Sequence, residues 1–277
     1  MGEYVRERRS DRSLTDAKIG VAGCGRMGKP MLAALRSAGF DAHGFDVRNI
    51  EGVETKADAF AQNLAILVTV VRDELETDQV LFTDQNFTAQ ATDLETIIIS
   101  STLSPTYVKS LRDRVPTHIA MIDAPMSGAQ IRAENATLSF MLGGDVNTLD
   151  RLQPLFNAMG RDFHRMGDYS SAMTAKVLNN LLAASSTAMT RLVLDWADAN
   201  DVDEAKLLDL IHTSSGQNWL ASGFNEIEFA RDGYEPDNTI GILVKDIAAA
   251  LDIAPEGAST ALPELIQLTI RGLNPRP

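Results

Sequence analysis

Cysteine and histidine are scarce in this chain of 277 residues, which contains one cysteine and four histidines. Cys24 has no second cysteine with which to form a disulfide, and one thiolate cannot build a cysteine-based metal site. The histidines do not recur at metal-ligand spacing, so we expect no metal centre. The absence of disulfides favours a reducing, cytoplasmic setting.

Long apolar runs are also missing, since none approaches the ~18 consecutive apolar residues of a membrane-spanning helix. Basic residues number 25 against 38 acidic ones, which gives a formal net charge of −13. Because such a surface repels nucleic acids and anionic membranes, we expect neither as a partner. The content of 44% hydrophobic and 23% charged residues is typical of a globular protein, and the length suits about two domains.

Residues 1–17 contain no apolar stretch like that of a secretory signal peptide. Their arginines are a feature of transit peptides, but Glu3, Glu7 and Asp11 are acids that transit peptides avoid. We interpret residues 1–17 as a flexible N-terminal extension.

A glycine-rich turn follows the first strand-like segment. Apolar residues at 19–22 predict a short buried strand, which ends at a glycine turn before a strongly helical segment. In such a turn Gly23 permits the tight bend, Gly25 lets the backbone approach a pyrophosphate, and Gly28 lets the helix pack closely. A purely structural glycine turn is the alternative. The cofactor-binding residues expected in this loop are Gly23, Gly25, Arg26, Met27 and Gly28.

Asp46 directly follows a second strand-like segment, residues 42–45. An acid about 20 residues beyond the glycines is where a Rossmann unit binds the adenosine ribose. Asp46 therefore favours NAD over NADP, because a carboxylate repels a 2′-phosphate. Arg48, two residues later, keeps NADP possible. An ordinary surface aspartate is the alternative.

Strand-like and helical segments alternate as far as Gly167. We predict strands at 64–71, 96–101, 119–124, 137–144 and 163–166. Helices are predicted from Asp73, over 104–115 and over 145–159, with Ser104 as an N-cap before Pro105. Alternation of this kind predicts a parallel sheet whose ligand lies at the carboxyl ends of the strands. Val70, Val71 and Thr102 are therefore expected near the cofactor.

The remainder of the chain has only helical patterns. We predict a long helix over 170–200, followed by helices at 204–212, 217–231, 239–251 and 261–270. The expected fold class is an α/β Rossmann dinucleotide-binding domain, residues 18–168, joined by the long interdomain helix to an all-α C-terminal domain, residues 169–277. Mostly apolar residues recur at helical spacing on the long helix: Leu178, Leu181, Leu182, Ser185, Met189, Leu192 and Trp196. Because this half carries more leucine, methionine and tryptophan than one small domain readily hides, we predict a homodimer or tetramer formed through it.

Lys176 and Asn180 are four residues apart on the long helix and therefore share a face. An ammonium group beside an amide could hold one substrate oxygen, and partial burial would lower the lysine pKa enough for acid and base catalysis. A solvated surface lysine is the alternative on spacing alone.

Four segments, in order, resemble those of the β-hydroxyacid dehydrogenase family, which includes 3-hydroxyisobutyrate dehydrogenase and tartronate semialdehyde reductase. The loop from Gly23 to Met31 is similar to the family's GxGxMGxPM. The segment Asp123-Ala-Pro-Met-Ser-Gly-Ala129, with Gly143-Gly144, is similar to its D-x-P-V-S-G-G substrate segment. Lys176-Val-Leu-Asn-Asn180 resembles K-x-x-N-N, and Lys245-Asp246 resembles the K-D-L segment.

The resemblance implies an NAD(P)-dependent oxidoreductase that interconverts a small 3-hydroxy acid and its semialdehyde. It implies that Lys176 is the catalytic acid and base. The implied substrate-binding residues are Ser127, Gly128, Ala129 and Asn180, and Val71, Thr102 and Lys245 would contact the cofactor. The chain departs from the family in three places. Ala129 replaces a glycine, Arg132 stands where glycine is common, and residues 272–277 fall short of the family's usual C-terminal glycine and acid segment. Arg132 could bind an anion or be a solvated loop residue.

Two other functions remain open from the sequence. An imine reductase on the same scaffold typically has another residue in place of the helix lysine, so Lys176 argues against it. A non-catalytic dinucleotide-binding sensor would bind the cofactor but turn over no carbonyl compound.

Overall fold

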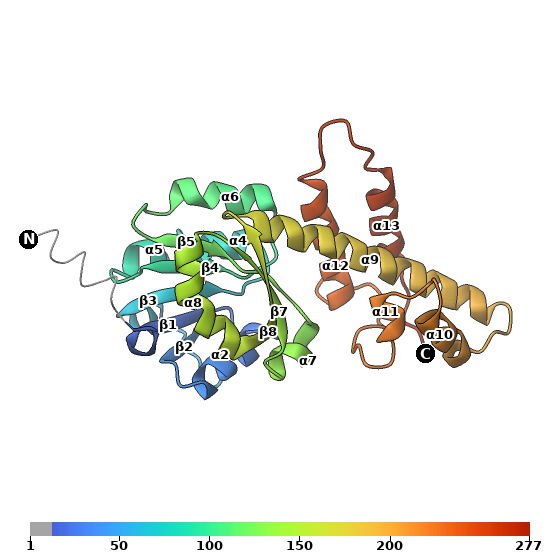
Figure 1. Cartoon of the computed structure of the whole chain (residues 1–277), viewed down its shortest axis with the longest axis horizontal. Coiled ribbons are helices and arrows are strands. Elements are labelled where there is room, and N and C mark those ends of the chain that lie inside the picture. The colour runs from blue at the N-terminus through green and yellow to red at the C-terminus, as the bar shows by residue number, and fades with distance from the viewer. Residues whose placement is uncertain (1–12) are drawn as a thin grey trace, which may run out of the picture. The chain divides into compact units, whose positions relative to one another are not determined.

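The computed structural model describes residues 13–277 (Figure 1). The chain divides into two compact units, Met1–Lys176 and Val177–Pro277. The predicted extension of residues 1–17 lies mostly outside the described residues. Its last part forms a short 3₁₀ helix, η1 (Leu14–Asp16), and Ala17 is buried.

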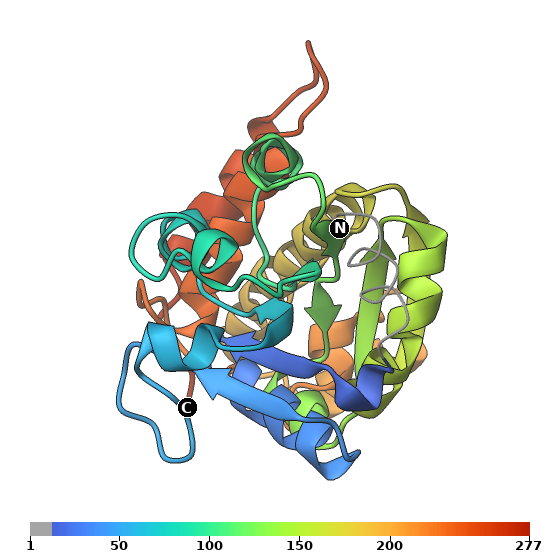
Figure 2. The same cartoon turned by 90° about the vertical axis from the view of Figure 1, so that its left-hand side faces the viewer.

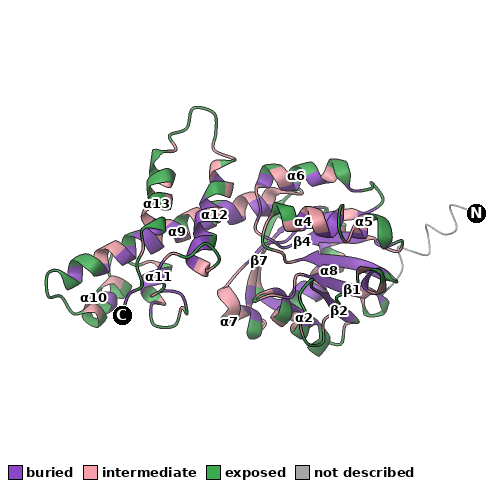
Figure 3. Ribbon diagram, turned by 180° about the vertical axis from the view of Figure 1, so that it is seen from behind, coloured by how far each residue is buried: buried purple, intermediate pink, exposed green. Residues whose placement is uncertain are grey.

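The first unit contains one eight-stranded sheet in the order β2-β1-β3-β4-β5-β7-β6, with β8 paired to β7. The strands from β2 to β5 are parallel, as predicted. Every residue of β3 is buried, because helices cover both faces of the sheet (Figures 2 and 3). The strands are β1 (Lys18–Ala22), β2 (Ala42–Phe45), β3 (Leu64–Thr69), β4 (Thr96–Ile99), β5 (Ala120–Asp123), β6 (Met126–Ser127), β7 (Leu138–Gly143) and β8 (Gly160–Gly167).

The predicted parallel pairing holds from β2 to β5 but not beyond β5. Strand β7 runs antiparallel to both β5 and β6, and only β8 is parallel to it. A parallel neighbour needs a crossover that returns along the whole strand. The helix between β6 and β7 has six residues, which rise about 9 Å, whereas the six residues of β7 extend about 20 Å.

Two hydrophobic cores lie in the first unit. One includes Leu32 and Leu35 of α2 together with Leu152 and Phe156 of α8. The other lies between the sheet and helices α3 to α6 and includes a group of three phenylalanine rings, Phe45, Phe60 and Phe87. The helices are α2 (Gly28–Ser37), α3 (Ala57–Ala61), α4 (Glu74–Leu81), α5 (Phe87–Gln90), α6 (Pro105–Arg114), α7 (Ala129–Glu134) and α8 (Val146–Met159).

Local signals for helix ends are confirmed. Ser104 caps α6 by accepting hydrogen bonds from the N–H groups of Thr106 and Tyr107, and Pro105 occupies the first turn. Asp145 caps α8, which ends at Gly160 as predicted. The short helices α3, α5 and α7 were not predicted, because four to six residues are too few to show a helical period.

The regular elements of the second unit, Val177–Pro277, are all helices joined by turns and loops. The long helix α9 (Ser171–Asp198) continues into it, followed by α10 (Glu204–Thr213), α11 (Trp219–Ser222), α12 (Thr239–Leu251) and α13 (Ala261–Arg271). The predicted helix over 217–231 is wrong beyond its first turn. Asn218 caps α11 and Gly223 ends it, and the chain then continues in turns.

The buried face of helix α9 is not the face that carries the apolar stripe predicted from spacing. Within the second unit its buried residues include Ala184, Ala188 and Leu194. Four members of the predicted stripe are instead exposed: Leu178 (50%), Leu182 (71%), Met189 (60%) and Trp196 (65%). Most of the predicted stripe therefore lies at the surface of the second unit.

Candidate functional site

The glycine loop has the shape that its sequence predicts. Gly23 has a φ of +93°, and a Cβ atom there would lie 2.5 Å from the carbonyl oxygen of Val70. A Cβ atom on Gly28 would lie 1.9 Å from the carbonyl oxygen of Gly23. At Gly25, by contrast, the nearest contact of such an atom would be an Arg48 guanidinium nitrogen at 3.5 Å. Gly23 and Gly28 therefore shape the turn, while Gly25 leaves the loop surface open.

The loop and the ends of neighbouring strands meet at one edge of the sheet. The N–H of Val70 donates to the carbonyl of Ala22 at 2.7 Å, and the N–H of Val71 donates to the Ser101 hydroxyl at 2.9 Å. Thr102 follows β4 at the same edge and is half-buried. Of the other loop residues, Arg26 is exposed, and Met27 packs on the core beneath.

Asp46 is 5% exposed at the end of β2, so the alternative of a surface aspartate is wrong. Its Oδ2 accepts hydrogen bonds from the N–H of Cys24 and from Arg48, both at 2.9 Å. Its Oδ1 accepts from the Arg48 Nε at 2.9 Å and from the Arg48 backbone N–H at 3.0 Å. Burial raises the pKa of Asp46, but the hydrogen bonds from Arg48 and Cys24 outweigh it and hold that pKa below its ordinary value.

Removal of the Arg48 guanidinium is expected to shift cofactor preference toward NAD. Arg48 neutralises a carboxylate that would otherwise repel the 2′-phosphate of NADP, and an arginine at this place can bind that phosphate. We expect Arg48→Ala to weaken NADPH binding about tenfold, or about 1.4 kcal/mol, and to change NADH binding less than about threefold. Fluorescence titration of both cofactors measures this. Asp46→Ala should move the preference in the opposite direction, and equal losses for both cofactors in Arg48→Ala would contradict the assignment.

Cys24 is expected to be chemically inert in the folded protein. Its side chain is 2% exposed, and burial, with the negative charge of Asp46, raises its pKa to about 11. Because the thiolate is the reactive species, alkylation by iodoacetamide at pH 8 should be complete after denaturation and negligible before it. The raised pKa also contributes stability below the unfolded value, which is lost as the pH rises from about 9 toward 11. Rapid alkylation of the native protein would contradict this prediction.

The segment predicted to bind substrate forms the turn from β6 into α7. Ser127 ends β6 and pairs with Ser139 of β7. Gly128 has a φ of +136° and Ala129 a φ of +54°. The second value explains why glycine is usual at this position, since a left-handed backbone costs an L-residue about 1–2 kcal/mol.

Arg132 is not a free anion-binding group. Its guanidinium forms an ion pair with Asp162 at 2.8 Å, and its aliphatic stem packs where a Cβ atom on Gly128 would lie, at 2.7 Å. The stem therefore requires glycine at position 128.

Lys176 lies in the second turn of α9 and is 6% exposed. The alternative of a solvated surface lysine is therefore wrong. Long side chains with a charged end are rarely buried unless they are paired or functional. Sequence spacing indicated the helix face of Lys176 but not its burial.

Asn180 and Asp246 form a buried pair within the second unit. The Asn180 Nδ2 donates to the Asp246 Oδ2 at 2.6 Å, and the two residues are 9% and 3% exposed. The other Asp246 oxygen, Oδ1, accepts no hydrogen bond and lies 3.3 Å from the Lys245 Nζ. This arrangement fixes the orientation of the Asn180 amide. Asp246 was not predicted as a site residue, although the sequence shows it beside Lys245.

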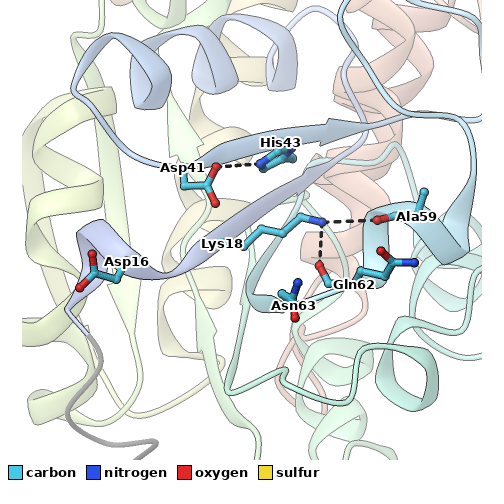
Figure 4. A pocket seen from close by; sticks show the side chains of 7 residues that line it. All are labelled: Asp16, Lys18, Asp41, His43, Ala59, Gln62 and Asn63. Atoms are coloured by element: carbon cyan, nitrogen blue, oxygen red, sulfur yellow. Dashed lines mark hydrogen bonds and ion pairs between the residues drawn. The ribbon is translucent and has the colours of Figure 1, made fainter.

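A polar cavity of about 280 Å³ lies where β1 and β2 begin, at the end of these strands away from the glycine loop (Figure 4). The Lys18 Nζ donates there to the carbonyls of Phe60 and Gln62, both at 2.8 Å, near the end of α3. His43 and Asp41 pair beside it at 2.8 Å. Since its ammonium group is engaged by backbone carbonyls, Lys18 has a structural role, and none of the predicted site residues lines this cavity.

Within residues 13–277, no three His, Cys, Asp or Glu side chains gather where they could hold a metal ion. Over the same residues, no helix has both the length and the apolar character needed to cross a membrane.

Family comparisons cover both units. Residues 18–167 match the family described as the NAD binding domain of 6-phosphogluconate dehydrogenase. Residues 170–269 match the family described as NAD-binding of NADP-dependent 3-hydroxyisobutyrate dehydrogenase.

Individual relatives agree with these matches. The chain is 27% identical to an NAD-dependent L-serine dehydrogenase of Pseudomonas aeruginosa, over 88% of this chain and 87% of the relative. It is 29% identical to the mitochondrial 3-hydroxyisobutyrate dehydrogenase of Drosophila melanogaster, over 85% of this chain and 77% of that one. A solved structure of Mycobacterium tuberculosis 3-hydroxyisobutyrate dehydrogenase with L-serine superposes with a TM-score of 0.73 at 26% identity, covering 91% of each chain.

The matched families and the glycine loop agree on a nicotinamide cofactor, and the residues at the loop fit one. Gly25 leaves room for a pyrophosphate, and Asp46 and Arg48 lie where the adenosine ribose binds in this type of domain. The chain belongs to the β-hydroxyacid dehydrogenase family and is an NAD(P)-dependent oxidoreductase.

Proposed function

We propose that this enzyme interconverts a small 3-hydroxy acid and its semialdehyde, with Lys176 as the acid and base. The burial of Lys176, one helical turn from an oriented Asn180, is the observation that carries the proposal. The relatives support the substrate class, because 3-hydroxyisobutyrate and L-serine are both carboxylates that carry a hydroxyl group on C3.

A bound nicotinamide cofactor would supply the hydride chemistry at the carbinol carbon, and the chain's own residues would orient the substrate and move the proton. In oxidation, an uncharged Lys176 amine accepts the hydroxyl proton as the C–H bond breaks and the carbonyl forms. In reduction, the Lys176 ammonium donates that proton to the carbonyl oxygen. The Asn180 amide, held by Asp246, retains an N–H with which it can bind the same oxygen.

We propose further that Ser127 and the backbone of Gly128 and Ala129 bind the substrate carboxylate. In support, the positive φ values of Gly128 and Ala129 turn the backbone sharply at the start of α7. Successive N–H groups in such a turn form an anion-binding concavity. Val71, Thr102 and Lys245 are proposed to contact the cofactor. The domain bounds 18–168 and 169–277 also remain our proposal.

The first test is a spectrophotometric screen of the purified enzyme with NADH and NADPH against small semialdehydes, glyoxylate and cyclic imines. Turnover of a 3-carbon or 4-carbon semialdehyde, and of the matching hydroxy acid in reverse, is the expected result. Turnover of imines alone would indicate imine reduction instead. Cofactor binding without turnover across the whole screen would indicate a sensor.

We also propose that the chain forms a homo-oligomer through the exposed face of α9, and that it works in a reducing cytoplasm. The stripe follows steps of four and three residues, as in helices that pair with helices. Leu178, Leu182, Met189 and Trp196 are exposed, and Ser185 and Leu192 between them are half-buried. Between Val177 and Leu194 the single charged residue is Arg191, which is 2% exposed. From Leu178 to Leu192 this face therefore carries no exposed charge, which is unusual in a chain with a net charge of −13. The buried thiol of Cys24 is compatible with the reducing location.

Leu182→Glu is expected to convert the oligomer to a monomer, because it places a charge at the most exposed leucine of the stripe, 71% accessible in the single chain. Light scattering coupled to size exclusion at micromolar concentration measures the mass. Leu75→Glu, at an equally exposed leucine of α4 (69%), should leave the mass unchanged. A monomeric unmodified protein would contradict the proposal.

A further inference from the structure

Asp123 is a buried carboxylate that caps a helix far from it in sequence. It ends β5 and is 0% exposed. Its Oδ1 accepts a hydrogen bond from the N–H of Ser170 at 2.8 Å, and its Oδ2 accepts one from the N–H of Met173 at 2.6 Å. These donors belong to the entry and first turn of α9, where N–H groups have no partner within the helix. The carboxylate therefore ties the start of α9 to the end of a central strand.

Gly143 makes this contact possible. It pairs with Asp123 across β7 and β5. A Cβ atom on Gly143 would lie 2.3 Å from the Asp123 Oδ1 and 3.0 Å from the N–H nitrogen of Ala172. A side chain there would push the carboxylate away from the helix. The proposed reaction gives no role to Asp123 or Gly143, although both lie in segments that resemble family motifs. Both residues are needed for the contact between the Asp123 carboxylate and the start of α9.

The contact differs from an ordinary helix cap. Asp145 caps α8 from the residue directly before that helix, accepting hydrogen bonds from the Thr148 N–H at 2.8 Å and hydroxyl at 2.9 Å, and it is exposed. A cap from the preceding residue stabilises its helix but does not fix the position of that helix on the sheet. Asp123 acts across 47 and 50 residues, and burial raises its pKa although the hydrogen bonds from the Met173 and Ser170 N–H groups lower it.

Other contacts hold the same turn in place. Ser170 adopts a left-handed φ of +77° immediately before the helix. Ala172 and Met173 are both 0% exposed, and the Met173 sulfur accepts a hydrogen bond from the Leu103 N–H at 3.5 Å. The first turn of α9 is therefore fixed in depth and rotation on the sheet. Lys176 follows Met173 by three residues, so its position is set by this turn.

We propose that Asp123 is a positioning residue for Lys176. By anchoring the first turn of α9 at the carboxyl end of β5, it sets where the Lys176 amine meets the substrate oxygen. The inference rests on the proposed function of Lys176.

The test compares Asp123→Asn with Asp145→Asn. In the first variant the amide NH₂ replaces one of two acceptors, so one hydrogen bond to the helix is lost and its first turn can shift. Because a misplacement of about 1 Å can reduce a rate about 100-fold, we expect a loss of about that size in kcat. The KM for the cofactor should change less than about threefold, and a primary isotope effect from substrate deuterated at the carbinol carbon should appear in full on kcat. Asp145→Asn makes the same chemical change at an exposed cap that positions no site residue, and it should leave kcat unchanged.

Three results would overturn the proposal: a folded Asp123→Asn with kcat within threefold of the unmodified enzyme, an equal loss in Asp145→Asn, or a rise in cofactor KM that accounts for the whole loss. Lys176→Met is measured in parallel. If Lys176→Met retains turnover, the proposed function fails. If Lys176→Met is inactive and Asp123→Asn is normal, only the positioning role fails.

A measurement on the unmodified protein covers the case in which Asp123→Asn does not fold. Hydrogen exchange should show the amides of residues 170–176 protected as strongly as those of β5. Exchange near the rate of an exposed helix end would overturn the anchoring role.

Discussion

Lys176→Met is expected to lower kcat about 1,000-fold while the dissociation constants of NADH and NADPH change less than about threefold. General acid and base catalysis by a positioned group contributes about 10²–10⁴ in rate, and methionine has no proton to exchange. Because the Lys176 side chain is 6% exposed, a long, unbranched methionine fills much of its volume without burying a charge. The fold, and with it the glycine loop, should remain intact.

The measurement pairs steady-state turnover with fluorescence titration of the cofactors, and Lys206→Met is the matched control. Lys206 is an exposed lysine on α10, so its removal should leave both quantities unchanged. Addition of small primary amines should restore part of the turnover to Lys176→Met. Retention of a tenth or more of the activity, or loss of cofactor binding with an intact circular dichroism spectrum, would contradict the assignment.

The dinucleotide-binding half was largely predictable because its signals are local. The strand, glycine turn and helix at 18–37 lie within a few residues of one another, and each glycine has a steric reason that the structure confirms at Gly23 and Gly28. Caps such as Ser104 and Asp145 are equally local. Strand β3 was predictable because a continuous apolar run indicates burial on both faces.

The remainder depends on contacts between residues far apart in sequence. The antiparallel β7 could not be inferred from its own composition, because strand direction depends on the length of the connection and not on the strand. Residue spacing on α9 indicated an apolar stripe, but it could not predict which face of this helix is buried in the second unit. The contacts of Asp123 and Asp246 could not be predicted for the same reason, although both residues lie in segments that resemble family motifs.

Gly25→Ala and Gly28→Ala are expected to fail in different ways, which separates the two tasks of the glycine loop. A methyl group at Gly25 meets only the end of the flexible Arg48 side chain, at 3.5 Å, so the melting temperature should stay within about 2 °C. The same methyl group lies where the pyrophosphate must approach the backbone. We expect cofactor affinity to fall about 100-fold, or about 2.7 kcal/mol.

Gly28→Ala places a methyl group 1.9 Å from the carbonyl oxygen of Gly23, a contact with rigid backbone that cannot be relieved by a side-chain rotation. Overpacking of this kind costs about 3 kcal/mol, which lowers the melting temperature by about 5–10 °C in a chain of this size. Gly216→Ala, whose nearest contact would be an ordinary 3.8 Å, is the neutral control for both measurements. A stable Gly25→Ala that binds NADH normally would show that the loop does not receive the pyrophosphate. In that case Gly23 and Gly28 would serve only to join β1 to α2, as they would in a purely structural turn.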